Sequence, residues 1–535
     1  MTIPAANTFD FIVIGAGTAG CVLAARLSEN PRHRVCLIEA GGSEQHPYID
    51  IPAAVGAAIM SERFGWGLTT TPQTALNDRV IPLPRGKVIG GSGSVNGMAY
   101  YRGSARDYDD WAGRGNHGWS YQELLPYFKR SEHNEHYRDS PYHGVGGPMA
   151  VNFIQRPNPL CDVFNATMAE LGFRHCDDFN VAEPEGYGYR QGTIAGGRRV
   201  STASAYLRPA MQRKNLTVMT NTLTRRIVVE QGRAVAVEIQ TASGVQRLRA
   251  EREIVLSAGT FHSPHILLHS GIGDQAELGA AGIAPVHHLP GVGRNLTDHP
   301  ASYIAMDTGD STSYGLSWKA SLRDLWNGLE YLVARQGPLG SNLFETNAYI
   351  KSRDGLDRPD MQVVFQPARR NVKPFPLPLG HGYAISIVCL YPDSRGTVKV
   401  SSNDPLSKPS IDPQLGNAPQ DLETIVRGLK LARRILGHGN FAPYRAHERL
   451  PGAAVHSDAE LLQYVRNTLH TVHHPGCTCR MGNDALAVVD HQLKVHGLQG
   501  LRVVDASIYP RLVGANTNAS VVAIAEKAGD MLVSA

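Results

Sequence analysis

The chain has 535 residues, of which 42% are apolar and 55 are glycine, and this length exceeds what a single hydrophobic core usually serves. Its 52 Lys and Arg residues against 48 Asp and Glu leave a formal net charge of +4, spread without a basic block of the kind that nucleic-acid binders carry. We therefore expect two or more domains, a small-molecule partner and no nucleic acid.

The start of the chain shows no features of a targeting segment. Residues 1–17 lead into a strand-like stretch, with no basic region, long apolar run or small-residue cleavage site. No stretch approaches the ~18 apolar residues that a membrane span needs. The seven cysteines are odd in number and scattered, which favours reduced thiols over a disulfide framework. These features predict a cytoplasmic protein with no integral membrane segment and leave peripheral membrane contact open.

The first elements form a predicted βαβ unit. The sequence FDFIVI (9–14) is typical of a buried strand, GAGTAG (15–20) of a turn, residues 21–30 of a helix and RVCLIEAGG (34–42) of the next strand. This order indicates a doubly wound α/β domain.

Four residues in this unit fit a dinucleotide. Gly15 would allow the tight turn, Gly17 would let backbone amides approach a pyrophosphate, and Gly20 would let the helix pack closely on the strand. The helix N-terminus would then face the two phosphate charges. Glu39 ends the second strand, where a carboxylate can accept hydrogen bonds from a ribose. The pattern predicts dinucleotide binding without choosing between NAD and FAD, and a cofactor-free doubly wound domain is the alternative.

A second glycine-rich segment, RGKVIGGSGSVNGMAYYRG (85–103), has six glycines and the small polar residues Ser92, Ser94 and Asn96. It follows the period of neither a helix nor a strand. Such a loop can bring backbone close to a flat or charged ligand, and an ordinary surface loop is the alternative.

The segment HHPGCTCRMG (473–482) places two histidines and two cysteines within seven positions. Structural zinc sites use two separated ligand pairs with wider internal spacing, and no second pair is found. Cys477 and Cys479 are therefore expected to be buried packing thiols. His474 precedes a proline, which favours extended backbone and can aim a ring from a fixed support. His474 is thus a candidate base, and His473 is expected to pack beside it.

Four further elements are predicted from the sequence pattern. The sequence TVKVSS (397–402) alternates like a half-buried strand, and ETIVRGLKLARRIL (423–436) has helical spacing. The strand LRVVD ends at Asp505, and residues 519–532 are typical of an apolar helix that begins near Thr517 and Asn518.

Five segments together resemble the glucose-methanol-choline (GMC) oxidoreductases, a family of flavoenzymes that oxidise alcohols. The loop over 85–103 is similar to the family's first signature, and GTFHSPHILLHSGIG (259–273) is similar to its second. The match continues in family order through PGVGRNLTDH (290–299), HPGCTCRMG (474–482) and VVDASIYPRLVGANTNASVVAIAEKAGDML (503–532).

The resemblance implies a fold and a division into domains. The fold is α/β, with a discontinuous Rossmann-like FAD-binding domain and a substrate-binding α+β cap domain. The FAD-binding domain would take residues 1–155, 190–300 and 475–535, the last part carrying active-site residues. The substrate domain would take residues 156–189 and 301–474, where substrate choice is expected to lie.

The resemblance also assigns site residues. It implies that His474 faces the flavin as the catalytic base, and that Asn518 is the second catalytic residue, for which a helix cap is the alternative. Asp505 would reach the ribityl chain or the pyrophosphate. The residues expected to bind the cofactor are Gly15, Gly17, Thr18, Ala19, Gly20, Glu39, Ala40, Arg85, Gly90, Gly91, Ser92, Ser94, Asn96, Gly97, Met98, Ala258, Asp505, Ala506, Thr517 and Asn518.

Several positions bear on cofactor attachment and substrate. Val95 stands where some relatives attach FAD through a histidine, so FAD is expected to bind noncovalently. Ser520 stands in place of a family proline near the last helix. Glu345 could meet a cation such as the ammonium of choline or serve a structural role. Arg369 and Arg370 could attract an anionic substrate, although paired arginines usually face solvent.

The resemblance implies FAD-dependent oxidation of a primary alcohol to the aldehyde. A neutral imidazole can take the hydroxyl proton, an amide can stabilise the oxygen, and flavin N5 accepts the hydride. The alcohol, and whether the electron acceptor is oxygen, a quinone or another carrier, stay undetermined. The alternatives are a lyase that uses His474 without net flavin redox, a noncatalytic flavin-binding protein and a nicotinamide dehydrogenase.

Overall fold

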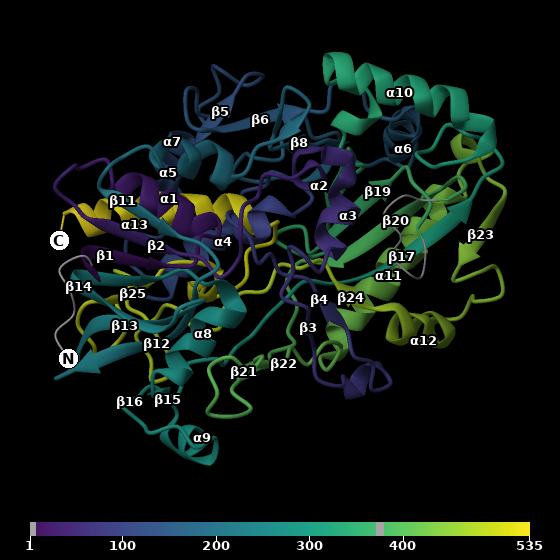
Figure 1. Ribbon diagram of the computed structural model, residues 1–535. Coiled ribbons are helices and arrows are strands. Elements are labelled where there is room, and N and C mark those ends of the chain that lie inside the picture. Colours follow the sequence, from purple (N-terminus) through teal and green to yellow (C-terminus); the bar gives the residue numbers. More distant parts are fainter. Residues whose placement is uncertain (1–6, 371–378, 535) are drawn as a thin grey trace.

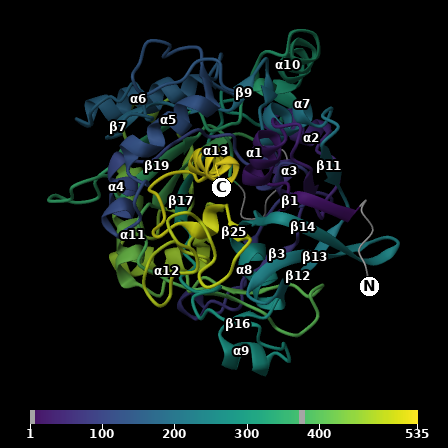
Figure 2. The same ribbon diagram turned by 90° about the vertical axis from the view of Figure 1, so that its left-hand side faces the viewer.

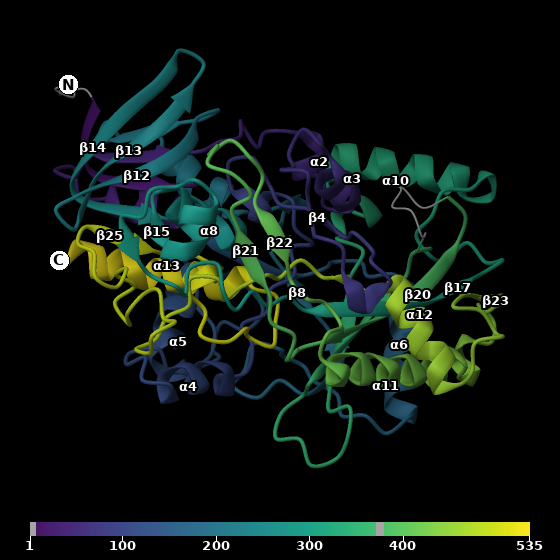
Figure 3. The ribbon, with the colours of Figure 1, turned by 90° about the horizontal axis from the view of Figure 1, so that it is seen from below.

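Two seven-stranded sheets organise the fold (Figure 1). The computed structural model describes residues 7–370 and 379–534. The first six residues, on which the expectation of no targeting segment partly rests, lie outside the described residues. Seen from below, the first sheet lies to one side of the molecule, and the second sheet lies to the other (Figure 3).

The first sheet is parallel at its centre. Strand β1 pairs in parallel with β2 on one side and β14 on the other, and its residues 11–14 are buried. Because such a strand is buried on both faces, its residues form a continuous apolar run in the sequence. The sheet order is β11-β2-β1-β14-β13-β12, with β25 against β14. Its strands are β1 (Thr8–Ile14), β2 (Val35–Ile38), β11 (Leu216–Met219), β12 (Leu223–Glu230), β13 (Arg233–Thr241), β14 (Gly244–Leu256) and β25 (Leu501–Val503).

The predicted βαβ unit is confirmed. Helix α1 (Thr18–Leu27) follows β1 directly and precedes β2, so the turn occupies three residues fewer than the glycine pattern suggested. The helix begins earlier because Gly17 already serves as its N-cap. The strand over 397–402, the helix over 423–436 and the last helix are likewise confirmed, as β21 (Thr397–Lys399), α11 (Pro419–Leu436) and α13 (Asn518–Val533).

The second sheet is antiparallel and has helices against it. Its order is β23-β17-β20-β19-β18-β7, with β24 against β17. Apolar side chains of α6 (Pro159–Glu170) and α11 share a core with its central strands. The strands are β7 (Gly186–Tyr189), β17 (Pro300–Asp307), β18 (Thr346–Ile350), β19 (Met361–Gln366), β20 (Gly382–Cys389), β23 (His447–Leu450) and β24 (His470–Thr471).

The remaining longer helices lie around these sheets. They are α4 (Ala105–Gly113), α5 (Tyr121–Ser131), α8 (Gly259–His269), α10 (Ser321–Ala334) and α12 (Asp458–Thr468). None of the helices in the described part of the chain is long and apolar enough to cross a bilayer.

Helix α13 packs along α1, although their contacting residues stand 500 positions apart (Figures 1 and 2). Thr18 Oγ1 donates to Asn518 Oδ1 at 2.8 Å. Further along the two helices, Arg26 donates from Nε and Nη2 to the two carboxylate oxygens of Glu526, at 2.9 and 2.8 Å. The Glu526 carboxylate is fully buried, so these charge-assisted bonds offset the cost of its desolvation. The two helices thus form one unit.

Candidate active site

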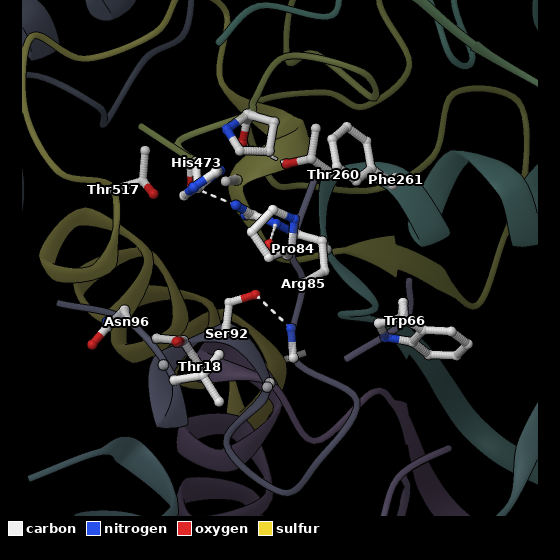
Figure 4. Close-up of a pocket in the computed structure, with 18 of the residues that line it drawn as sticks. Thr18, Trp66, Pro84, Arg85, Ser92, Asn96, Thr260, Phe261, His473 and Thr517 are labelled. Carbon is white, nitrogen blue, oxygen red and sulfur yellow. Dashed lines mark hydrogen bonds between the residues drawn. The ribbon is translucent and has the colours of Figure 1, made fainter. Parts of the chain in front are cut away.

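A cavity of about 820 Å³ is lined from both sheets. Ile14 of β1 and Ile38 of β2 contribute at one end, and Val364 of β19 and Val388 of β20 contribute at the other. Its volume is near the upper end of the range for small-molecule sites. In Figure 4, Thr18 and Asn96 lie on one side of this cavity, across from His473.

The glycine turn forms one wall of the cavity. Gly15 has φ +96°, and a Cβ there would lie 2.6 Å from the carbonyl oxygen of Ser257, so only glycine fits. A Cβ on Gly17 would meet nothing closer than 3.8 Å, because this residue faces the cavity. The N-terminus of α1 begins here without a side-chain cap. Its free amides and positive dipole end suit a pyrophosphate.

Glu39 is positioned for a ribose. Its Oε2 accepts from the Ala16 amide at 2.9 Å, and its Oε1 accepts from the Gly41 amide at 2.7 Å. Burial raises the pKa of Glu39 to about 7, against the opposing effect of these hydrogen bonds. A carboxylate has further lone pairs for ribose hydroxyls.

Most residues expected to bind the cofactor line this cavity. Together with the open face at Gly17 and the carboxylate at the end of β2, they fit an extended dinucleotide such as FAD. The lining includes Gly15, Gly17, Thr18, Ala19, Glu39, Ala40, Arg85, Gly91, Ser92, Asn96, Gly97, Met98, Ala258, Asp505, Ala506, Thr517 and Asn518.

Three expected residues support the wall from behind instead. A Cβ on Gly20 would lie 1.9 Å from the carbonyl oxygen of Gly15, so Gly20 allows α1 to approach the turn. The Gly90 amide donates to the Ala16 carbonyl at 2.6 Å. The hydroxyl of Ser94 is turned to the Ile89 carbonyl at 2.8 Å. These residues hold the two glycine-rich loops together.

His474 lies in the cavity with both ring nitrogens engaged. Its Nδ1 lies 3.1 Å from Nδ1 of His299, and its Nε2 lies 2.9 Å from the amide nitrogen of Asn516. Its backbone amide donates to Asp298 Oδ1 at 2.8 Å. Because the Asn516 amide nitrogen can only donate, Nε2 carries the lone pair and Nδ1 carries the proton that it shares with His299.

The surroundings of His474 favour its neutral form. Burial lowers its pKa well below the usual 6.5, and His299, His473 and Arg85 add to this effect. Burial also lowers the pKa of His299 to about 4, so its ring accepts as a neutral imidazole. A neutral ring with its lone pair at Nε2, where it accepts only from an amide that a substrate hydroxyl can displace, has the form that a general base requires.

Asn516, and not Asn518, is the amide that contacts His474. Asn518 is the first residue of α13, and its Oδ1 accepts from Thr18. Both asparagines line the cavity. The structure therefore places the two expected catalytic residues in the same cavity without bringing them together, and sequence analysis missed Asn516, two positions upstream.

His473 also lines the cavity but is turned by a φ of 67°. Its carbonyl accepts from Arg85 Nη2 at 2.7 Å, so the glycine-rich loop fixes the backbone just before His474 (Figure 4). Burial lowers the pKa of His473 to about 3, with Arg85 and Arg370 adding to the effect. His473 is thus another neutral imidazole at this end of the cavity.

The cysteines of this segment are buried in the hydrophobic core that contains the central strands of the first sheet. Burial raises the pKa of Cys477 to about 12 and that of Cys479 well above its ordinary value. Their burial in an apolar core fits the expected packing role. Among the described residues, no group of three or more His, Cys, Asp or Glu side chains is arranged to hold a metal ion.

The carboxylate oxygens of Glu345 already accept hydrogen bonds from protein donors. Its Oε2 accepts from the Asn158 amide at 2.7 Å, and its Oε1 accepts from Tyr314 at 2.7 Å and from Ser341 at 2.5 Å. It is 1% exposed and does not line the cavity. The structure therefore places Glu345 in a structural network and outside the cavity lining.

The chain matches the GMC oxidoreductase family over residues 9–301 and again over residues 392–525. Oxygen-dependent choline dehydrogenase of Photobacterium profundum is 39% identical, covering 98% of this chain and 93% of the relative. Alcohol dehydrogenase (acceptor) of Pseudomonas putida is 38% identical, covering 98% of this chain and 96% of the relative.

Solved structures agree over the whole length and confirm the expected fold class. Pyridoxine 4-oxidase from Mesorbium loti has a TM-score of 0.88 and 33% identity, with 98% of each chain covered. A formate oxidase variant of Aspergillus oryzae, described in connection with FAD modification, has a TM-score of 0.91 and 26% identity, covering 100% of this chain and 99% of the other. This chain therefore belongs to the GMC oxidoreductase family.

Proposed function

We propose that this protein catalyses the FAD-dependent oxidation of a primary alcohol to the aldehyde. The observation that carries the proposal is the pairing of His474 Nε2 with the Asn516 amide inside the cavity that also contains the dinucleotide turn. Relatives named choline dehydrogenase, alcohol dehydrogenase (acceptor) and pyridoxine 4-oxidase support the reaction class.

His474 is the proposed base. Neutral at physiological pH, it accepts the hydroxyl proton of the alcohol at Nε2 while His299 keeps the ring in the required tautomer. The Asn516 amide exchanges its hydrogen bond to Nε2 for one to the same oxygen, as negative charge develops on that oxygen. Arg85 holds the backbone of His473, and Asp298 holds the amide of His474, so the ring needs little reorganisation.

FAD, when bound, supplies the acceptor for the hydride that leaves the carbinol carbon. The residues proposed to hold it are the glycine turn, Glu39 and the segment that contains Asn96. Val95 lines the cavity and has no group that can form a covalent bond to a flavin, so we propose that FAD is held noncovalently.

The test is an anaerobic titration of the purified holoenzyme with a panel of primary alcohols, followed by the visible flavin spectrum. Bleaching by one of them, with formation of the matching aldehyde, is the expected result. A flavin that no member of a broad panel reduces, in a protein that binds the same alcohols, would overturn the proposal.

The lyase alternative finds no support among the relatives described above, which are named as dehydrogenases or oxidases. The proposal concerns the reductive half of the catalytic cycle, which dehydrogenases and oxidases share. The relatives differ in the other half, since one is named oxygen-dependent and another is named for an unspecified acceptor.

A further inference from the structure

Arg370 lines the cavity on the side of the second sheet. Its Nη1 donates to Ser386 Oγ at 3.0 Å, and its Nη2 donates to His470 Nε2 at 2.8 Å. The guanidinium carbon lies 4.1 Å from the centre of the Tyr303 ring. The side chain is therefore fixed by three neighbours, and a preorganised guanidinium loses little entropy on binding a ligand.

His470 is held so that it can only accept from this arginine. An arginine has no acceptor atom, so the Nε2 of His470 must carry the lone pair. Its Nδ1 then donates to the Thr468 carbonyl at 3.3 Å. Burial lowers the pKa of His470 well below 6.5, and Arg370 adds to this effect, so the ring stays neutral. His470 thus positions the guanidinium without neutralising its charge.

Arg370 has no carboxylate partner among the described residues. Its neighbour Arg369, by contrast, forms an ion pair with Asp307 at 2.9 Å and does not line the cavity. The undescribed segment 371–378 contains no Asp or Glu in its sequence and so cannot supply one. A cation held in a cavity is stabilised by an opposite charge. An anion from outside the protein would provide it.

A second donor lies on the same wall. Gln362 of β19 is 4% exposed, and its amide nitrogen has no hydrogen-bond partner in the described structure. Gln362 pairs across the sheet with Val388, and Val364 pairs with Ser386, and all four line the cavity. Buried donors usually have partners, so a ligand acceptor is expected here.

Acidic groups are confined to the other part of the cavity. Of the described residues that line it, the only carboxylates are Glu39 and Asp505. Glu39 lies at the end of β2, and Asp505 accepts from Ser263 Oγ at 2.6 Å and from the Gly259 amide at 2.9 Å. A cationic alcohol would therefore meet Arg370 without a compensating negative charge.

We propose that Arg370, with Gln362, binds a carboxylate on the substrate, so that the alcohol oxidised by this enzyme is a hydroxy acid rather than a quaternary ammonium alcohol. This substrate class rests on the function proposed above. The carbinol lies at His474 and Asn516, and the carboxylate lies beyond His473 on the wall formed by β19 and β20. The planar carboxylate matches the fork of the guanidinium.

The test compares matched substrates and matched variants. 4-(Hydroxymethyl)benzoate and 4-methylbenzyl alcohol share a benzylic carbinol and differ in charge, and choline supplies the opposite charge. The wild-type holoenzyme is expected to prefer the acid in kcat/KM. In Arg370→Met this preference should fall about 10²-fold, because a site built to pair a charged group discriminates strongly. Arg369→Met is the control and should keep the preference.

A binding measurement separates this proposal from the proposed function. Benzoate is expected to perturb the visible flavin spectrum of the wild-type holoenzyme without turnover, and benzamide is expected to bind more weakly. If benzoate binds and no alcohol reduces the flavin, the anion site stands and the oxidation proposal falls. If alcohols reduce the flavin but the wild-type enzyme prefers choline, the anion site is overturned. Equal binding of benzoate and benzamide would overturn it as well. Both results come from the wild-type enzyme, so they hold even where Arg370→Met does not fold.

Discussion

The Nε2 atom of His474 and the amide nitrogen of Asn516 lie 2.9 Å apart and point at one another inside the cavity. A substrate hydroxyl that displaces this hydrogen bond would find an acceptor for its proton at Nε2 and a donor for its oxygen at the amide. The pair therefore provides both functions that proton abstraction from an alcohol requires.

His474→Gln should lower kcat by about 10²- to 10⁴-fold, because glutamine fills a similar space but cannot take a proton. FAD content should be unchanged, since the ring of His474 holds no part of the glycine turn. Stopped-flow flavin reduction with a saturating alcohol measures the effect. A variant with wild-type reduction rates and full FAD would remove the assignment of the base.

Asn516→Ala should slow flavin reduction by about 10²-fold, the cost of removing one donor to a developing oxyanion. Asn518→Ala is the matched comparison, because it deletes the same amide two positions away. Its main effect should be on FAD affinity and stability, since it breaks the bond to Thr18 that ties α13 to α1. A large rate effect confined to Asn518→Ala would contradict the assignment.

In the pH profile of kcat/KM for a neutral alcohol, the fall in activity at low pH (the acid limb) should occur well below pH 6.5. Burial lowers the pKa of His474, so the base stays deprotonated as the pH falls through the range in which an ordinary histidine becomes charged. Asp298 contacts the His474 amide, and burial raises its pKa to about 6, so Asp298→Asn removes a neighbour whose titration could imitate this limb. A limb centred near 6.5 in both proteins would show an unshifted base.

Gly17→Ala and Gly20→Ala should fail in different ways. A Cβ at Gly17 clears the protein by 3.8 Å but enters the cavity, so FAD binding should weaken by about tenfold or more with little change in apoprotein stability. A Cβ at Gly20 would lie 1.9 Å from the Gly15 carbonyl oxygen, which should lower the free energy of unfolding by about 2–3 kcal/mol. FAD titration and urea unfolding distinguish the two effects.

Acid precipitation of the holoenzyme should leave the yellow colour in the supernatant. Val95 offers no nucleophile to the flavin, so only noncovalent contacts hold it, and these are lost when the chain unfolds. Colour that remains in a washed pellet would show a covalent link at another side chain.

The glycine turn between β1 and α1 was predictable because its requirements are local. Gly15, Gly17 and Gly20 act within one strand, turn and helix, and the order of these elements can be seen in the sequence. The carboxylate of Glu39 follows from the same unit, since parallel strands place their carboxyl ends at one edge of the sheet.

The partner of His474 was not predictable to the residue. The segment NTN offers two asparagines, and the resemblance placed the role on the one that begins the helix. Because α13 begins at Asn518, Asn516 lies in the preceding non-helical segment and its side chain is free to face His474. The location of a helix start relative to a site is set by tertiary packing, to within a residue or two.

Contacts between segments far apart in the chain also could not be predicted from the sequence. His299 meets His474 across 175 positions, and Arg370 meets His470 across 100. Nothing in the adjacent pair Arg369 and Arg370 indicates that one binds Asp307 while the other enters the cavity. Both residues lie after the end of β19, where the strand pattern no longer predicts which way a side chain turns.

Helices α1 and α13 can pack together only after the whole chain has been synthesised. Helix α1 leaves the ribosome among the first residues, yet Thr18 and Arg26 contact α13 through residues 518 and 526, which are made last. At synthesis rates of roughly 5–20 residues per second, this leaves the nascent chain without its finished cofactor site for roughly half a minute or more. With the cofactor site proposed above, the growing chain is an apoprotein throughout translation and binds FAD only after residue 526 has emerged.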